Sequence, residues 1–471
     1  MAPLWQLSAA QLVAGYGNGN FSPVDALQAC LERTAACQPL TNAFVDTGPG
    51  CAQAAHAAAQ ASARRWATGS TLSALDGVPV SLKDNLHAAG LPTTWGSRLL
   101  NNYMPAADEL PVARLRAAGM VIFGKTNLPE FAMQGYTHNS RWGTTRNPWN
   151  PALTPGGSSG GAVAAVASGC GPIALATDGG GSIRRPASHT GLVGFKPSAD
   201  CVARADGLPE LFLDHEVAGP IGRSVADVAL VMQVLAPALG VVPEARPARI
   251  LFIPTFAAHP VDPHIARLTR LAARQFADLG HTVKEAARFD LAEEVNSLWP
   301  TLSNTGFAWL MDRAAQVPEF QLQPGASPDL SLCMPALQEA RRLGQAASAN
   351  TFFALLTAVN HLKLQLDRLF EQHDFLLTPA AAALPWPADE IYPPDIAGLP
   401  VGPRGHAIFT GMANAAGLPA VALPCGMASG LPVGLQLVGR QHADLALLAL
   451  AQQFETAHPQ TALWNAQGIP A

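Results

Sequence analysis

The sequence predicts an α/β protein organised around one large core. Helical patterns alternate along the chain with short apolar runs that are typical of buried strands. Of the 471 residues, 49% are hydrophobic and only 13% are charged, so one large core is feasible although the chain exceeds the usual length of a domain. We therefore expect a single domain over residues 1–471.

The N-terminal part is predicted to contain three helices, at residues 8–14, 22–36 and 52–68. Ser22 and Pro23 provide an N-cap followed by proline at the first helical position. The third helix is rich in alanine, and Arg64 and Arg65 lie near its C-terminal end, where cations interact favourably with the helix dipole.

A buried strand is predicted at residues 78–82, and it ends at Lys83. Polar Asp84 and Asn85 follow. A lysine at the end of a buried strand either extends its amine to solvent or takes part in the chemistry of a site.

Residues 119–126 match the phosphate-binding pattern GxxxxGKT. The four intervening residues are Met, Val, Ile and Phe, which favour a strand at 120–123 after a helix at 111–118. Pro129 also lies where the helix of a phosphate loop should already be established. The sequence therefore disfavours a nucleotide site.

The stretch 155–197 places Ser158 and Ser182 in two glycine clusters, GGSSGG and DGGGSIRRP. A helix of small residues at 162–168 and a strand at 173–177 are predicted between them. Glycines let a ligand approach the backbone, and consecutive N–H groups before Ser182 can converge in front of a nucleophile. Two ordinary Gly-Ser turns are the alternative, but two such clusters flanking one helix and one strand favour chemistry.

Residues 157–161 also match the GxSxG nucleophile elbow, with Ser159 at its centre. That elbow requires a strand directly before it. Pro148, Pro151 and Pro155 exclude a central strand there, so the elbow interpretation is disfavoured.

The rest of the chain continues the alternation of helices and strands. Residues 198–218 are expected to be irregular, and a turn then leads into a helix capped by Ser224. Helices are expected at 263–279, at several places within 294–372 and at 444–456, and strands at 249–254, 374–379, 420–424 and 431–438. His259 and His264 have no metal-ligand spacing, and no metal or cofactor is expected.

Composition excludes several classes of protein. The net charge of −5 and the absence of a run of four Lys or Arg argue against a nucleic-acid partner. The seven cysteines contain no C-x-x-C pair, which favours reduced thiols. No signal peptide or membrane span is evident, so we expect a cytoplasmic protein.

A serine nucleophile needs a base, and two candidates are present. His189 lies seven residues after Ser182, on a predicted helix. Lys83 is the other candidate. At the ordinary lysine pKa of about 10.4, only about four side chains in ten thousand are neutral at pH 7. Burial must therefore lower the pKa of Lys83 if its amine is to act as a base. Ser158 can carry a proton from Ser182 to Lys83, which gives a Ser-Ser-Lys relay.

The segments VPVSLKDN, GGSSGG and TDGGGSIRRPA together resemble the amidase signature family. The two motif serines are 24 residues apart, as in that family. The resemblance implies that Ser182 is the acyl-forming nucleophile, that Ser158 is the bridging serine after a cis peptide bond, and that Lys83 is the base. It further implies that an oxyanion hole is formed by the N–H groups of Gly179, Gly180, Gly181 and Ser182. The supporting residues that it implies are Ser159, Asp178 and Arg184.

The resemblance covers nearly the whole chain, with a signature core at about 70–230. It implies a single α/β/α domain whose central, mixed and twisted sheet of about eleven strands is covered by helices on both faces. It also implies metal-independent hydrolysis of carboxylic amide C–N bonds, with aryl esters or carbamates (urethanes) as further substrates. The alternatives are the glutaminase subunit of a tRNA-dependent amidotransferase, whose SLDQIGP-like segment is replaced here by FLDHEVAGP, and a catalytically inactive binding scaffold.

The expected partner is a small-molecule amide or carbamate, bound by a monomer or homodimer, with no nucleic acid and no membrane. The segment 200–220 departs from the family pattern where the substrate-facing loop falls. Apolar residues there and in two other segments favour an aryl or alkyl acyl group over a charged one; they are Tyr136, Leu208, Leu211, Phe212, Leu213 and Ile408.

Overall fold

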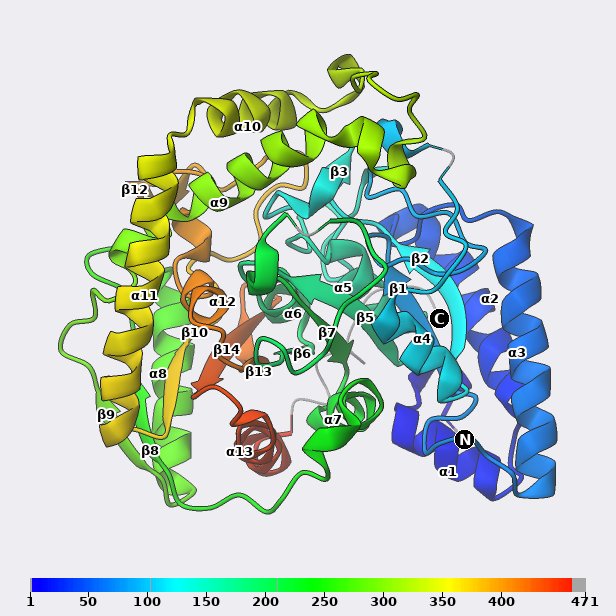
Figure 1. The fold of residues 1–471 in the computed structure, drawn as a ribbon. Coiled ribbons are helices and arrows are strands. Elements are labelled where there is room, and N and C mark those ends of the chain that lie inside the picture. Colours follow the sequence, from blue (N-terminus) through cyan, green and yellow to red (C-terminus); the bar gives the residue numbers. More distant parts are fainter. Residues whose placement is uncertain (1, 102, 210, 460–471) are drawn as a thin grey trace.

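A mixed sheet of ten strands forms the centre of the structure, a computed structural model that describes residues 2–101, 103–209 and 211–459 (Figure 1). The strand order is β2-β1-β5-β7-β6-β13-β14-β10-β8-β9. The sheet strands are β1 (Pro79–Lys83), β2 (Val121–Thr126), β5 (Ile173–Asp178), β6 (Val193–Lys196), β7 (Val217–Gly222), β8 (Arg249–Phe252), β9 (Thr282–Glu285), β10 (Phe375–Pro379), β13 (Ala420–Ala428) and β14 (Leu431–Gly439). Parallel pairs at both ends flank an antiparallel middle, and the predicted α/β class is confirmed with ten strands.

Two short ribbons complete the described strands, pairing β3 (His138–Asn139) with β4 (Gly143–Thr144) and β11 (Asp395–Ile396) with β12 (Leu399–Pro400). The α-helices are α1 (Ala9–Gly17), α2 (Pro23–Thr41), α3 (Pro49–Thr68), α4 (Leu110–Ala117), α5 (Gly160–Ala167), α6 (Arg184–Thr190), α7 (Val225–Leu235), α8 (Pro263–Asp278), α9 (Glu293–Asp312), α10 (Pro335–Ala346), α11 (Ala349–Gln372), α12 (Gly411–Ala415) and α13 (Asp444–Ala457). In Figure 1, α2 and α3 lie beside the β2 edge, whereas α9, α10 and α11 lie on the other side of the molecule.

The two faces of the sheet bury side chains of different size. Along β5, Ile173 and Leu175 point into a core shared with α7, α8 and α13, whereas Ala174 and Ala176 point into a core shared with α5 and α6. This alternation follows from the period of two in a strand. Because the second face carries small residues, α5 and α6 pack close to the strands whose ends carry the functional residues.

Strand β7 was expected to be a turn, and that prediction was wrong. Its sequence, VAGPIG, contains two glycines and a proline, which are poor strand formers. It nevertheless pairs antiparallel with β5 over six residues, from Ile173 opposite Gly222 to Asp178 opposite Val217. Tertiary pairing inside a central sheet overrides the local preference.

The GKT segment lies inside strand β2 and does not form a phosphate loop. Lys125 is fully buried, and its amine contacts the Asp84 carboxylate at 3.2 Å and donates to the Leu86 carbonyl at 2.8 Å. The nucleotide interpretation is thus excluded by the local structure.

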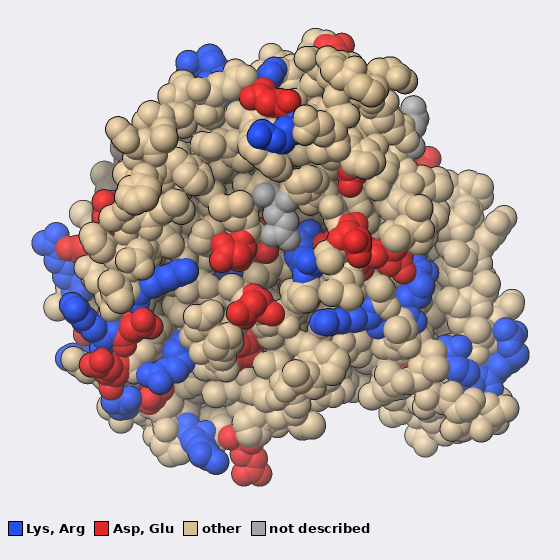
Figure 2. Space-filling view, viewed as in Figure 1, with Lys and Arg blue, Asp and Glu red and all other residues tan. Residues whose placement is uncertain are grey.

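All seven cysteines are free thiols. The surface carries charges of both signs. Figure 2 shows lysine and arginine side chains interspersed with aspartate and glutamate on the face viewed. Within residues 2–459, apart from the two undescribed positions, no helix is long and apolar enough to cross a membrane.

Candidate active site

Lys83 lies at the end of β1 and is fully buried. Strand β5 runs parallel to β1 and pairs Leu82 with Leu175, so Thr177 lies beside the lysine. The Lys83 Nζ atom is 2.7 Å from Ser158 Oγ, 3.0 Å from Thr177 Oγ1 and 3.3 Å from the Thr177 carbonyl oxygen. The amine therefore points into the protein toward the first serine cluster, not out to solvent.

Burial lowers the pKa of Lys83 to about 7, because the ammonium form loses its hydration. The negative charges of Glu216 and Asp178 act in the opposite direction, and the positive charge of Arg204 adds to the lowering. About half of the molecules therefore carry a neutral amine at pH 7, compared with about four in ten thousand for an ordinary lysine. Lys83 has the protonation state that a general base requires.

The first serine cluster is a tight loop between β4 and α5, and the Gly157–Ser158 peptide bond is cis, as expected. A side chain at Gly157 would place its Cβ 2.6 Å from the Tyr136 carbonyl oxygen, so this position requires glycine. The Ser159 N–H donates to the Ser182 carbonyl at 3.2 Å, and the Ser159 hydroxyl donates to the Thr177 carbonyl at 3.3 Å. These bonds hold the two serine clusters against each other at the end of β5.

The second serine cluster turns around the Asp178 carboxylate. This carboxylate accepts hydrogen bonds from the N–H groups of Gly181 at 2.6 Å and Ile183 at 3.0 Å. Gly181 has φ +110°, and a Cβ there would lie 2.1 Å from Thr410 Oγ1. Ser182 follows this turn and is 8% exposed, whereas Ser158 is 1% exposed. Ser182 lines the cavity described below, and Ser158 does not.

The N–H groups before Ser182 divide into two sets. The Gly181 N–H is engaged by Asp178, which removes it from the expected oxyanion-hole donors. Within the described part of the chain, the N–H groups of Gly179, Gly180 and Ser182 have no hydrogen-bond partner in the protein. These three are the donors available to a ligand.

Arg184 and Asp178 form a buried ion pair with 2.9 Å between Nη2 and Oδ1. The Arg184 charge and its hydrogen bonds hold the pKa of Asp178 well below its usual range, although burial alone would raise it. Arg184 also donates to Asn414 Oδ1 at 2.5 Å and to Gln436 Oε1 at 2.7 Å. The loop before Ser182 is thereby fixed to α12 and β14.

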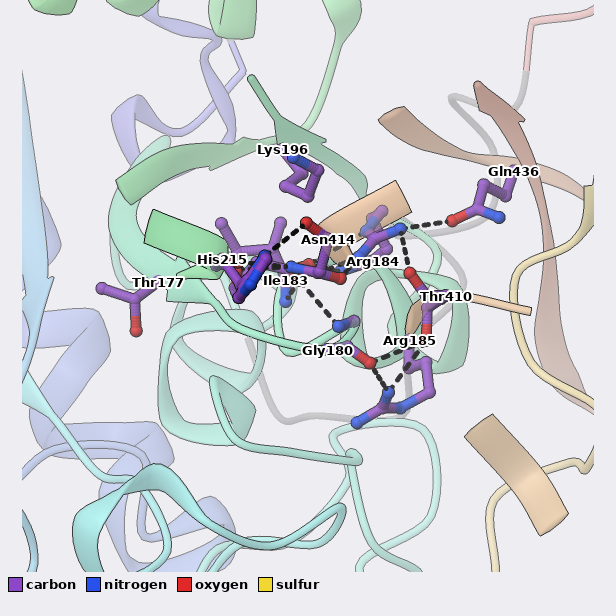
Figure 3. Close-up of polar contacts among 12 residues, drawn as sticks. Thr177, Gly180, Ile183, Arg184, Arg185, Lys196, His215, Thr410, Asn414 and Gln436 are labelled. Atoms are coloured by element: carbon purple, nitrogen blue, oxygen red, sulfur yellow. Dashed lines mark hydrogen bonds and ion pairs between the residues drawn. The ribbon is translucent and has the colours of Figure 1, made fainter. Parts of the chain in front are cut away.

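Arg185 holds the same loop from the opposite side (Figure 3). Its guanidinium donates to the Gly180 carbonyl and, at 2.9 Å, to Thr410 Oγ1. Thr410 in turn donates to the Gly180 carbonyl at 2.8 Å. The carbonyl of Gly180 is thus turned toward Arg185 and Thr410, which fixes the orientation of the glycine backbone.

A cavity of about 340 Å³ opens in front of Ser182. The glycine loop forms part of its lining, and residues 132–135, α9 and α10 contribute a mixture of apolar and polar side chains. Its lining includes Met133, Gly179, Gly180, Ser182, Arg185, Phe212, Glu216, Trp299, Ser303, Glu339, Leu343, Arg404 and His406.

Of the five residues expected to bind substrate, Phe212 lines this cavity. Leu208 is buried in the core against α9 and Leu213 is 49% exposed, while Tyr136 and Ile408 line neighbouring hollows. These four residues do not line the cavity in front of Ser182, and their role in binding substrate stays a prediction. The segment 200–220 folds with Leu208 and Leu211 inward as core, which leaves Phe212 at the cavity.

Several cavity residues were not identified from the sequence. Trp299 was assigned to the core, and it is buried but also lines the cavity. Arg404 and His406 lie far from the motifs in sequence and carry no local signal. Arg185 had a signal, since it directly follows the motif arginine in SIRRPA.

The other residues weighed from the sequence, Ser159 and His189 as catalytic groups and His259 as a metal ligand, make contacts outside the Lys83–Ser158 pair. Ser159 precedes α5 with no strand before it, so it does not form a nucleophile elbow. His189 lies on α6, as expected, but its Nε2 contacts the Ala383 carbonyl at 3.2 Å, away from Ser182. His259 contacts Glu293 at 2.9 Å near the surface.

Comparison with known proteins identifies relatives over nearly the whole chain. A family model described as Amidase matches residues 25–448. A glutamyl-tRNA(Gln) amidotransferase subunit of Symbiobacterium thermophilum is 33% identical, over 95% of this chain and 96% of that protein. The corresponding subunit of Moorella thermoacetica is also 33% identical, over 96% of each chain.

Solved structures with the same architecture include two hydrolases. A bacterial aryl acylamidase of the amidase signature family has a TM-score of 0.87 and 28% identity, over 98% of this chain and 99% of that chain. A 6-aminohexanoate cyclic dimer hydrolase has a TM-score of 0.86 and 26% identity, over 98% and 99% of the two chains.

Proposed function

Because the chain belongs to the amidase signature family, we propose that it hydrolyses carboxylic amide C–N bonds through an acyl-enzyme on Ser182. The observation that carries this proposal is the 2.7 Å contact between Lys83 Nζ and Ser158 Oγ, made by a lysine whose pKa is lowered to about 7. A buried amine with that pKa is suited to accept a proton near neutral pH.

In the first half of the reaction, Ser182 Oγ bonds to the carbonyl carbon of the amide. Its proton passes to Ser158, which gives its own proton to the neutral amine of Lys83. The carbonyl oxygen becomes an oxyanion and accepts hydrogen bonds from Gly179, Gly180 and Ser182 N–H groups. The proton then returns through Ser158 to the leaving nitrogen as the C–N bond breaks.

In the second half, water attacks the ester carbon of the acyl-enzyme. The same relay removes the proton of the water and returns one to Ser182 as the ester bond breaks, which releases the carboxylic acid. Ser159, Asp178 and Arg184 act by positioning the two loops. Ser159 and Asp178 bond to backbone groups of β5 and of the loop at Ser182, and Arg184 bonds to Asp178 and to the side chains of Asn414 and Gln436.

Labelling with a fluorophosphonate, followed by mass spectrometry of peptides, tests this proposal. We expect a single adduct on Ser182, its loss in Ser182→Ala, and parallel loss of amide hydrolysis. A labelled Ser158 or an unlabelled protein would contradict the assignment, and the second result would favour the binding-scaffold alternative.

The second candidate is the glutaminase subunit of a tRNA-dependent amidotransferase, which is favoured by the names of the relatives at 31–34% identity. The two functions differ in what the isolated chain does. An amidohydrolase turns over anilides and carboxamides by itself, whereas a glutaminase subunit is specific for glutamine and supplies ammonia to a partner. Ammonia release from glutamine, measured beside nitroaniline release from anilides, separates them.

We further propose a small-molecule amide or carbamate as the partner, with aryl esters and urethanes as secondary substrates. The chain is proposed to act in the cytoplasm as a monomer or homodimer, without nucleic acid. A panel of matched anilides, esters and carbamates with one acyl group measures the order of these activities.

A further inference from the structure

The cavity in front of Ser182 contains two arginines with no carboxylate partner among the described residues. Its two acidic lining residues are each paired: Glu216 with Arg204 at 3.7 Å, and Glu339 with Arg342 at 2.6 Å. Arg185 and Arg404 line the same cavity and form no ion pair within the described chain. No carboxylate of the described chain is therefore in direct contact with either of these two guanidinium groups.

The hydrogen bonds of the Arg185 side chain all end on uncharged oxygens. Its acceptors are the Gly180 carbonyl, Thr410 Oγ1 at 2.9 Å and the Gly157 carbonyl at 3.4 Å, and its Nε atom is buried without an acceptor. Burial lowers the pKa of Arg185, and the positive charge of Arg404 lowers it further, so the two guanidinium groups are close enough to repel each other.

The Arg404 side chain makes no hydrogen bond to any described residue. Arg404 directly precedes the short helix Gly405–Ala407 and lines both this cavity and the neighbouring hollow lined by Ile408. Its Nη2 atom is buried without an acceptor among the described residues. Burial lowers the pKa of Arg404 as well, but an arginine stays protonated at neutral pH. A planar guanidinium with free donors is the usual partner of a carboxylate.

His406 supplies a third free polar group at the same wall. It is 3% exposed and lines the cavity, and neither ring nitrogen has a hydrogen-bond partner among the described residues. Burial and the charges of Arg185 and Arg404 hold its pKa well below the usual range, so the ring is neutral and offers one N–H donor. Buried polar groups in folded proteins are normally paired with protein, ordered water or a ligand, so this ring is available to a ligand group at the cavity.

We infer that the cavity binds a substrate carboxylate between Arg404, Arg185 and His406, so that the preferred substrates are amides that also carry a free carboxylate. This inference rests on the proposed amidohydrolase function, because Ser182, Gly179 and Gly180 line the same cavity. The side chains of Phe212 and Trp299, which line the cavity beside the glycine loop, then contact the hydrocarbon part of the substrate. A carboxylate on the acyl side would be at odds with the expected uncharged acyl group, whereas a carboxylate on the amine side is compatible with it.

The carboxylate can belong to the acyl side or to the amine side, and two matched pairs of ligands distinguish these sources. For the acyl side, N-(4-nitrophenyl)succinamic acid is compared with its terminal carboxamide, which has the same shape without the charge. For the amine side, 4-acetamidobenzoate is compared with 4-acetamidobenzamide. Binding is measured by calorimetry on Ser182→Ala, so that the readout does not depend on turnover.

We expect the carboxylate of one pair to bind at least tenfold more tightly than its carboxamide, since a charge-assisted pair with arginine is commonly worth a factor of about ten to a hundred. Adding Arg404→Gln should reduce this preference to less than threefold. The matched control, Arg274→Gln on the exposed face of α8, removes the same charge far from the cavity and should leave the preference unchanged.

Three results would overturn the inference. The first is equal affinity within both pairs, and the second is no binding of either carboxylate at millimolar concentration. The third is a preference for the carboxylate that persists in the Arg404→Gln and Arg185→Gln variants. Turnover by the enzyme with Ser182 intact is measured separately with the same four compounds. Carboxylate preference without Ser182-dependent cleavage would refute the proposed function alone, whereas cleavage without preference would refute the carboxylate site alone.

Discussion

The pH dependence of amide hydrolysis gives a quantitative test of Lys83 as the base. With its pKa lowered to about 7, the amine is neutral in about 9% of molecules at pH 6 and about 91% at pH 8. Because the relay requires the neutral form, kcat/KM should rise about tenfold between these values and then level off. A lysine with the ordinary pKa of about 10.4 would instead give about a hundredfold rise, continuing toward pH 10.

The assay follows nitroaniline release from 4-nitroacetanilide between pH 5.5 and 9.5 at constant ionic strength. This substrate is chosen because it has no group that titrates in that range. Glu216→Gln provides a second perturbation. The Glu216 carboxylate stabilises the ammonium form, so removing it should lower the pKa of Lys83 and move the rise to lower pH. Glu339→Gln is the matched control, since Glu339 lines the same cavity but pairs with Arg342.

Lys196 requires a separate control, because burial lowers its pKa to about 7 as well. Its amine donates to the Pro197 carbonyl at 2.7 Å, outside the relay, so Lys196→Met should keep the rise in kcat/KM. Lys83→Ala should lose it, together with most of the rate. A midpoint near pH 10, a shift to higher pH in Glu216→Gln, or a near-native Lys83→Arg enzyme would refute the assignment of the base.

Three further predictions follow from other contacts of the site and core. Ser182→Ala should abolish turnover, whereas Ser158→Ala should leave a small residual rate, because water can partly replace a proton relay but not the nucleophile; equal single-turnover rates would contradict these roles. Arg184→Met leaves the buried Asp178 carboxylate unpaired and should cost about 3–5 kcal/mol of unfolding free energy, measured by urea denaturation; a loss below about 1 kcal/mol would contradict a supporting role. Burial raises the pKa of Glu455 to about 7 in the folded protein, compared with about 4.5 in the unfolded chain. The folded state therefore gains stability from protonated Glu455 below pH 4.5, and this gain is lost as the pH rises to 7. Glu455→Gln should therefore raise the unfolding free energy at pH 8 by about 1–3 kcal/mol but not at pH 4, and a gain confined to pH 4 would show the opposite sign.

The catalytic loops could be predicted from the sequence because their chemistry is local. Glycines before Ser158 and Ser182 allow backbone conformations that other residues resist, and Lys83 interrupts an otherwise apolar strand end. The helix and the strand between the two serines were also predicted, with ends within two residues of those of α5 and β5. Each of these features can be recognised within a short window of sequence.

Other parts of the structure depend on contacts between distant segments. Strand β7 was missed because its glycines and proline argue against a strand until β5 and β6 pair with it. The cavity was missed because residues from the 130s, 180s, 290s and 400s form it together. No local pattern marks Arg404 or His406, whose free donors become evident only when the surrounding chain is in place.

The elements that carry the reacting groups and the helices α9 and α10 that line the cavity pack into different hydrophobic clusters. Strand β1, which carries Lys83, and strand β5, which leads to Ser182, pack into clusters shared with α5, α6, α7 and α13. Helices α9 and α10 pack into another cluster, together with α11 and α12. Substitutions on the α9–α10 wall can therefore accumulate without disturbing the relay. This division makes the fold modular: new substrate ranges can evolve, or be engineered, by changing Ser303 or Leu343 while the reaction itself is inherited intact.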